Sequence, residues 1–130
     1  MQTAIKLTLA SFFILIIGGC ATMADSIDAK GTGQFRVYDQ DYDTVWNAVL
    51  DVVSSSQLDL VSRDKEQGQM LAQRGMSALS YGQNVAIFVE PAGTASRTRV
   101  EVVSKRAVAT DVLARNWETH ILEALDGKLN

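Results

Sequence analysis

The sequence predicts an α+β fold in which an antiparallel sheet of about four to five strands carries two helices on one face. Two segments place apolar residues at the three- and four-residue spacing of a helix that buries one side. Five shorter segments alternate apolar and polar residues or are rich in β-branched residues, and polar or glycine-containing turns separate them. The order is β-α-β-β-β-β-α, and two helices on the same face bury both apolar stripes against the sheet.

The predicted domain opens with a short strand and a helix. Residues 35–38 alternate as a strand. Asp41 or Asp43 then offers a carboxylate that can accept the free amide hydrogens at a helix start. Serines at 54–56 end this helix. Its apolar residues at helical spacing are Val45, Trp46, Val49, Leu50 and Val53.

Two strands follow the first helix. Residues 58–63 and 69–74 are predicted as strands on either side of a polar turn that closes on Gly68.

A hairpin comes next. Residues 85–90 and 98–104 are predicted as its strands, with a loop over 91–96. Val103 interrupts the polar face of the second strand, which predicts that this end of the sheet is covered on both sides.

The last element is a helix over 111–126. Thr110 or Asp111 can cap its start, and Gly127 is a good C-terminal stop. Trp46 and Trp117 are expected as the large anchors between the helices and the sheet. The apolar stripe of this last helix consists of Leu113, Trp117, Ile121, Ala124 and Leu125.

The N-terminus has the organisation of a secretory signal. Lys6 precedes an apolar run over 7–17, which is too short to cross a membrane, and two glycines follow it. The next residue, Cys20, is the single cysteine of the chain. Residues 17–20 resemble the lipobox of bacterial lipoproteins. The resemblance implies that residues 1–19 are cleaved and that the sulfur of Cys20 carries a diacylglycerol group.

The sequence after the predicted cleavage site divides into a tether and one domain. Residues 20–33 are small and polar without an apolar period, so they are predicted as the lipidated N-terminus and a flexible tether of about 20 Å. Residues 34–130 form a single α+β domain. Removing 19 of 130 residues leaves 111, which is enough for one domain and not for two.

Charge bears on the partners of this domain. The mature chain has 11 basic and 15 acidic residues once Lys6 is removed, which argues against a nucleic-acid partner. Local basic pairs such as Lys105 and Arg106 are interpreted as solvated strand edges.

The residue after Cys20 bears on location. In bacterial lipoproteins, an aspartate at this position retains the protein in the inner membrane. This chain has Ala21 there instead, which implies the periplasmic face of the outer membrane.

No residue pattern indicates catalysis, a metal or a cofactor. His120 is the single histidine and is expected at the edge of the apolar stripe, without a nucleophile or second histidine beside it. The alternating Asp39, Asp41 and Asp43 lack the glycine and glutamate of a calcium loop, so helix capping explains them better. The expectation is a non-enzymatic protein with no cofactor and no metal site.

One segment, residues 75–84, is longer than a hairpin needs. It carries Met76, Leu79 and Tyr81, which are the candidate contacts for a partner or ligand because loops on a rigid scaffold often carry function. The alternative is that the two flanking strands extend through this segment.

The pattern of elements also resembles a known family. Tyr42-Asp43-x-Val45-Trp46 at the helix start, the strand pair around Gly68, the hairpin and the C-terminal helix are similar in layout to the helix-grip domains of the BamC (NlpB) family of outer-membrane lipoproteins. The resemblance covers residues 34–127 and implies a helix-grip fold, membrane anchoring and a binding role. This chain has one such domain, where the BamC type has two.

Two functions remain after this reading. The first is a membrane-anchored, periplasm-facing lipoprotein that acts as an interaction module on an envelope protein. The second is a lipoprotein that binds a small molecule or lipid in a cavity between the sheet and the helices, lined by Trp46, Phe88 and Trp117.

Overall fold

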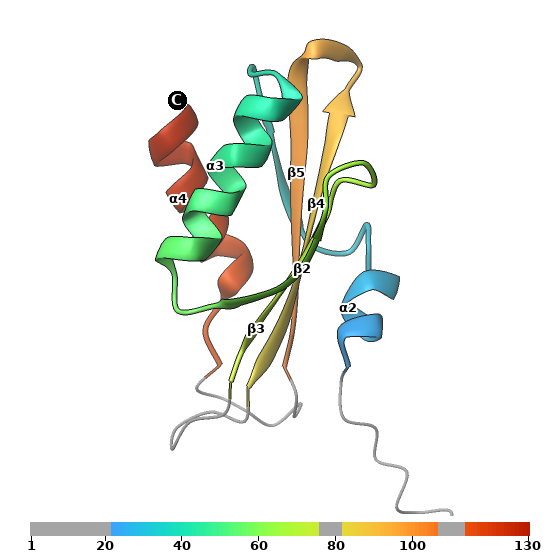
Figure 1. The fold of residues 1–130 in the computed structure, drawn as a ribbon, viewed down its shortest axis with the longest axis vertical. Coiled ribbons are helices and arrows are strands. Elements are labelled where there is room, and N and C mark those ends of the chain that lie inside the picture. Colours follow the sequence, from blue (N-terminus) through green and yellow to red (C-terminus); the bar gives the residue numbers. More distant parts are fainter. Residues whose placement is uncertain (1–21, 76–81, 107–113) are drawn as a thin grey trace, which may run out of the picture.

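The fold is a five-stranded antiparallel sheet with helices on both of its faces (Figure 1). The computed structural model describes residues 22–75, 82–106 and 114–130. The strand order is β1-β5-β4-β3-β2, so the predicted α+β class and antiparallel sheet are confirmed. The strands are β1 (Gln34–Tyr38), β2 (Asp59–Asp64), β3 (Gln69–Arg74), β4 (Gln83–Ala92) and β5 (Thr94–Arg106).

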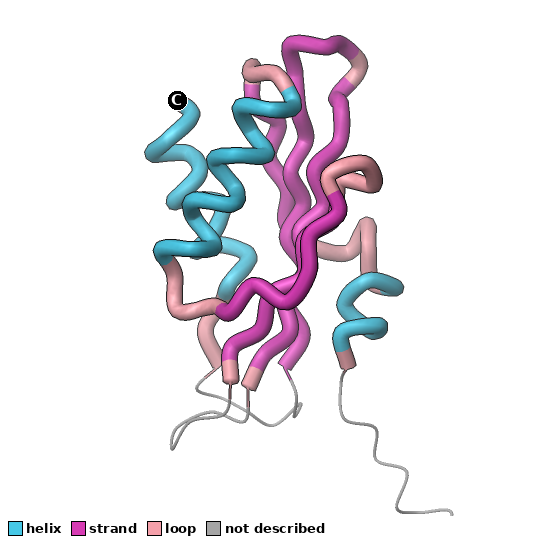
Figure 2. Tube along the Cα trace, viewed as in Figure 1, coloured by secondary structure: helices cyan, strands magenta, loops and turns pink. Residues whose placement is uncertain are grey.

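Two long helices cover one face of the sheet and a short helix covers part of the other. Helices α3 (Tyr42–Ser55) and α4 (Trp117–Leu129) pack side by side on the first face, as predicted (Figure 2). Helix α2 (Met23–Asp28) lies against strands β4 and β5 on the opposite face.

The core between the sheet and the two long helices is one apolar cluster. Its centre is formed by Trp46, Val49, Ile87, Trp117 and Ile121, which are all nearly or fully buried. The predicted stripe of α3 is confirmed except that Ala48 and Val52 are also buried and Leu50 lies at the margin. The Asp41 carboxylate accepts from the amide of Thr44 at 3.0 Å and therefore caps α3.

A second, smaller core lies on the opposite face. Leu71, Ala86, Phe88 and Val103 form its floor, and α2 covers them with Met23 and Ile27, together with Ala29 just beyond the helix. The expectation that Val103 marks an end of the sheet covered on both sides is confirmed.

The predicted flexible tether over residues 20–33 is wrong for its described part, because residues 23–28 form a helix packed on the sheet. Residues 23–28 are helical, with Thr22 as a capping residue whose side chain accepts from the amide of Asp25. Met23 and Ile27 are four residues apart and lie on one side of the helix, which is a short amphipathic stripe. Two apolar residues are too few to predict a helix from the sequence. Residues 23–28 become helical because Met23 and Ile27 can then be buried against the apolar residues of the sheet.

The last helix also differs from its prediction. Residues 114–116 are not helical, α4 starts at Trp117, and Asn116 caps it by accepting from the amide of Thr119 at 3.2 Å. The predicted start at Asp111, together with Leu113, lies outside the described residues. Gly127 lies inside the helix instead of ending it, and Ala124 is exposed while Leu122 is buried.

The hairpin of β4 and β5 is longer than predicted. The two strands pair from Gln83 and Arg106 to Ala92 and Thr94, so the expected six-residue loop shrinks to a turn around Gly93, whose φ is +84°. Pro91 stays within β4, which is possible because the register shifts beside it.

Candidate functional site

The residues singled out from the sequence as sites lie outside the described part of the chain. Cys20 precedes it, and Met76, Leu79 and Tyr81 fall in the gap between β3 and β4. Their roles stay predictions.

The single histidine lies on the surface. His120 is exposed, and its ring contacts the ring of the buried Trp117 at a centroid distance of 5.4 Å. It therefore lies at the edge of the apolar stripe, as expected, on the side that faces solvent. Within residues 22–75, 82–106 and 114–130, histidine, cysteine and acidic residues form no group of three or more that could hold a metal ion.

The cavity expected from the sequence does not have its predicted lining. Trp46 of α3 and Trp117 of α4 belong to the core between the long helices and the sheet, but Phe88 belongs to the second core on the other side of the sheet. Alternation along a strand puts neighbouring residues on opposite faces, and Val85, Ile87 and Val89 are the residues of β4 in the core under the helices. The indole of Trp117 is held by a hydrogen bond from its Nε1 to Oε1 of Gln83 at 3.1 Å, as part of the packing of the core.

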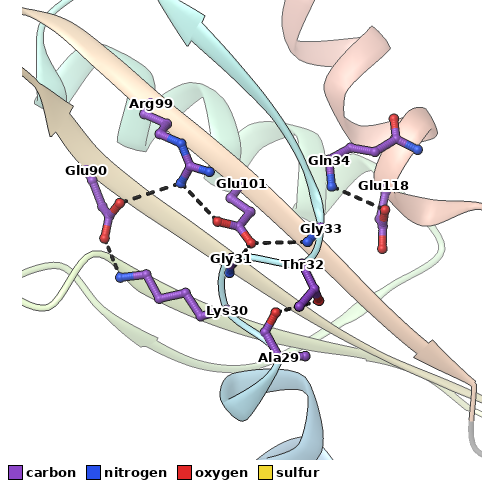
Figure 3. Close-up of polar contacts among 10 residues, drawn as sticks. All are labelled: Ala29, Lys30, Gly31, Thr32, Gly33, Gln34, Glu90, Arg99, Glu101 and Glu118. Atoms are coloured by element: carbon purple, nitrogen blue, oxygen red, sulfur yellow. Dashed lines mark hydrogen bonds and ion pairs between the residues drawn. The ribbon is translucent and has the colours of Figure 1, made fainter.

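A polar clamp joins the segment after α2 to the sheet (Figure 3). Its centre is Glu101 of β5, whose side chain is 1% exposed. The Oε1 atom of Glu101 accepts from the backbone amides of Gly31 at 2.5 Å and Gly33 at 3.2 Å, while Oε2 accepts from Arg99 at 2.9 Å. The clamp therefore fixes the entry of the chain into β1.

The clamp continues outward through charged groups. Arg99 also lies 3.6 Å from Glu90, which is paired with Lys30. The Lys30 ammonium lies 5.2 Å from the ring centre of Phe88, so it covers the outer side of the second core. The segment after α2 is thus held by apolar contacts, backbone hydrogen bonds and ion pairs together.

The electrostatics of Glu101 follow from these partners. Burial alone raises the pKa of a carboxyl because it penalises the charged form. In Glu101 this effect is outweighed by the hydrogen bond from Arg99 and by those from the amides of Gly31 and Gly33, so the pKa of Glu101 lies below its usual value. The carboxylate stays charged and works as a fixed acceptor at neutral pH.

Two edges of the sheet carry exposed apolar side chains. On β1, Phe35 is 52% exposed and Val37 is 40% exposed, and both point to the face that carries Glu101. On β2, Leu60 and Val61 are 38% and 54% exposed. A register shift between Leu60 and Ser62 makes the β2 edge irregular, whereas β1 pairs with β5 in unbroken register over all five residues.

The β1 edge is therefore the candidate interaction surface. Among the described residues no strand pairs with its outer side, although the amide of Gln34 donates to Glu118, and such a regular edge is a template for another strand. The guanidinium carbon of Arg99 lies 4.3 Å from the centre of the Phe35 ring, so the two groups form a cation–π contact. Sequence reasoning recognised residues 35–38 as a strand but could not single out their outer edge, because strand order is a property of the tertiary fold.

Comparison with known proteins adds little to this geometry. No family model matches the chain. No curated protein matches it either. Among solved structures, the crystal structure of Ara h 8.0201 is similar, with a TM-score of 0.36 and 10% identity, over 74% of this chain and 94% of that chain. A TM-score of this size carries no argument about function. In the part of the chain that the structure describes, no helix is long and apolar enough to span a membrane.

Proposed function

We propose that this protein is a lipid-anchored, periplasm-facing lipoprotein that acts as a non-enzymatic interaction module, and that its partner is an envelope protein that adds a strand to β1. The anchor is Cys20, and the membrane is the outer membrane, as the signal pattern and Ala21 suggest. The resemblance to the BamC family is in keeping with this proposal. The partner binds by backbone hydrogen bonds to the edge strand, with Phe35 and Val37 as side-chain contacts.

The observation that carries the proposal is the β1 edge itself. Its pairing with β5 is regular, and two large apolar side chains lie exposed on one face of a five-residue strand. Proteins usually protect such an edge with bulges or charges. The β2 edge has its register shift, whereas β1 has no bulge, and its Arg36 points to the other face, where it pairs with Asp126.

The described residues give no observation that favours the second expectation, a ligand cavity. The described side chains between the sheet and α3 and α4 belong to one buried cluster, and Phe88 lies on the other face.

The anchor is tested by metabolic labelling of cells with an alkyne-tagged fatty acid. The wild-type chain is expected to carry the label and to sediment with outer membranes. Cys20→Ser is expected to lose the label. A wild-type chain that carries no label would overturn the lipid anchor.

The interaction surface is tested by photo-crosslinking in living cells. A photoreactive amino acid at Val37 is expected to give one discrete adduct with an envelope protein. The matched controls are Val61, on the other edge, and Glu123, which is exposed on α4. Phe35→Asp is expected to abolish the adduct at Val37, whereas Val61→Asp leaves it. The same adduct at all three positions, or none at Val37, would contradict β1 as the contact.

A further inference from the structure

The chain enters its fold at one end of the long axis of the molecule. The start of α2 lies at the same end as the end of β3, the start of β4 and the end of β5 (Figure 1). Helix α2 contacts β4 and β5, and the hydrogen bonds from Thr22, helped by the charge of Lys105 near the end of β5, lower the pKa of Asp25.

This entry point leaves very little chain between the fold and the predicted anchor. Cys20 is two residues before Thr22, the residue that caps α2. An extended chain spans at most about 3.5 Å per residue, so the Cα atom of Cys20 lies within about 7 Å of that of Thr22. Because α2 is packed onto the sheet, an acyl group on Cys20 holds this end of the domain at the bilayer surface.

The same end of the molecule carries a group of basic residues. Arg74 of β3 pairs with Gln83 of β4, and Gln83 pairs with Arg106 of β5, so the two arginines lie on one face with Gln83 between them. The side chain of Gln83 also holds the backbone of Arg115, accepting from its amide at 3.0 Å and donating to its carbonyl at 2.7 Å. We call Arg74, Lys105, Arg106 and Arg115 the basic rim.

Among the described residues the basic rim forms no direct ion pair, although the charge of Lys105 acts on Asp25 of α2. By contrast, ion pairs are formed by Lys30, Arg36, Lys65, Arg97, Arg99 and Lys128.

Three acids beside the rim keep their charge but form no ion pair with it: Glu123 lines a surface pocket with Arg115, and Glu118 and Asp25 have backbone amides as partners. Both oxygens of Glu118 are occupied by the backbone amides of Gln34 and Ser104, and Asp25 accepts from Thr22. Asp59, at the start of β2, is the remaining carboxylate of the sheet at this end.

The opposite end of the molecule carries a group of acidic residues, two of which, Asp39 and Asp43, are paired with Arg97 and Lys65. Asp39, Asp41 and Asp43 gather where β1 passes into α3, and Glu66 lies in the turn between β2 and β3. This polarity favours one orientation beside an anionic surface, with the basic rim toward it and the acidic end away from it.

We propose that the basic rim docks on anionic phospholipid headgroups of the bilayer that holds the Cys20 lipid, so that the domain stands with its sheet rising from the membrane. This inference rests on the proposed lipid anchor. Arginine suits the role because its guanidinium can hold two phosphate oxygens at once. Each basic residue at an anionic surface favours the docked state by a factor of about five. Docking leaves the β1 edge free for a partner, since β1 runs away from the rim (Figure 1).

The test uses the mature chain, residues 20–130, coupled through the Cys20 thiol to a maleimide lipid in vesicles. Chemical coupling replaces acylation, so the result does not depend on whether cells acylate Cys20. A photoreactive amino acid is placed at Gln73, exposed near the rim, or at Thr94, exposed at the far tip of the hairpin. Lipid adducts are counted by mass spectrometry.

Adducts are expected at Gln73 and not at Thr94 in vesicles of phosphatidylethanolamine and phosphatidylglycerol. In phosphatidylcholine vesicles, or at high salt, the yield at Gln73 is expected to fall to the level at Thr94. Combining Arg74→Gln, Arg106→Gln and Arg115→Gln is expected to lower the docked-to-undocked ratio on the order of 100-fold.

The matched control combines Arg36→Gln, Arg63→Gln and Arg97→Gln, which remove the same charge elsewhere and are expected to leave the yield unchanged. Circular dichroism verifies that both triple variants are folded. Equal adducts at Gln73 and Thr94, a rim variant that behaves as the wild type, or a control that loses as much would each overturn the docking surface. Failed labelling of Cys20 in cells would instead remove the anchor and leave the vesicle result standing.

Discussion

Glu101 shows how one polar residue organises the less-covered face of the sheet. The alternation of residues 98–104 predicts Arg99 and Glu101 on the polar face of their strand, and both are there. Yet Glu101 is buried, because the backbone of residues 31–33 folds over it and donates two amides to its carboxylate. A buried carboxylate stays charged only where hydrogen-bond donors satisfy its oxygen atoms.

Glu101→Gln is expected to destabilise the protein by about 2 kcal/mol at pH 7, since a buried acceptor loses its charge while its donors stay in place. The measurement is urea unfolding followed by circular dichroism. Glu123→Gln, a change of the same kind at an exposed position of α4, is expected to leave the free energy of unfolding unchanged.

The same variant predicts a pH dependence. The pKa of Glu101 is lower in the folded protein than its ordinary value of 4.5, so its stabilising contribution is fully present above that value. The contribution is lost as the pH falls through the folded pKa. The stabilities of wild type and Glu101→Gln are therefore expected to begin to converge below about pH 4.5 and to meet below the folded pKa. A difference that stays constant down to pH 2 would contradict this role of the carboxylate.

Gly33 is a position where a side chain does not fit. A Cβ atom there would lie 2.1 Å from the carbonyl oxygen of Val102, so the backbone of β1 or β5 has to move. Gly33→Ala is expected to lower the thermal midpoint by several degrees, equivalent to about 1–3 kcal/mol. Gly75→Ala is the matched control, because nothing lies within 4 Å of its added methyl group. Equal melting of both variants would show that the approach at Gly33 relaxes freely.

At the scale of elements, α2 is the part of the fold that depends most on its neighbours. It has six residues, and isolated helices of that length do not form in water. It is held by the second core and by the clamp that follows it, so the helix, residues 29–33 and strand β5 act as one unit.

Ile27→Asp is expected to detach α2 while the sheet and the long helices stay folded, because a carboxylate cannot be buried against Phe88 without a partner. The measurement is hydrogen exchange of the amides of residues 23–33, which is expected to speed up locally. Ala24→Asp places the same charge on the exposed side of α2 and is expected to leave exchange unchanged. Global unfolding by Ile27→Asp would mean that the second core is indispensable to the whole domain.

At the scale of the whole molecule, a single sheet supports two cores of unequal size. The larger core, under α3 and α4, contains most of the buried apolar residues, and Trp117 is the largest of the fully buried side chains. The two ends of the molecule differ in charge, with the basic rim near the predicted anchor and the acids of the α3 start at the far end. Because α2 is packed on the sheet, the segment between the folded domain and the predicted anchor at Cys20 is short.

Trp117→Ala is expected to destabilise the domain by about 3–5 kcal/mol, a large part of the stability of a domain of this size. Trp117→Phe keeps most of the ring volume but loses the hydrogen bond to Gln83, and is expected to cost about 1–2 kcal/mol. Urea unfolding of the two variants checks the difference. A loss below 1 kcal/mol for Trp117→Ala would contradict its place as the anchor of the core.

Local patterns were enough to predict five strands, the two long helices and the antiparallel class, because alternation and helical spacing depend only on residues close together in the sequence. They also narrowed the capping residue of α3 to Asp41 or Asp43, of which the structure selects Asp41, and they identified the turn at Gly68. They did not identify the start of α4, where Asn116 caps the helix beside the side-chain contacts of Gln83 with Arg115. Those contacts join residues that are 32 positions apart in the chain.

The sequence by itself determined the five strands, the two long helices and the length available for one domain, and it predicts the signal that ends at Cys20. Only the tertiary structure decided the strand order, the free edge of β1, the burial of Glu101, the docking of α2 and the grouping of the basic rim. The physical reason is that the first set depends on preferences of adjacent residues. The second set depends on contacts between segments distant in the chain, such as Gly31 with Glu101, which exist only once the sheet is assembled.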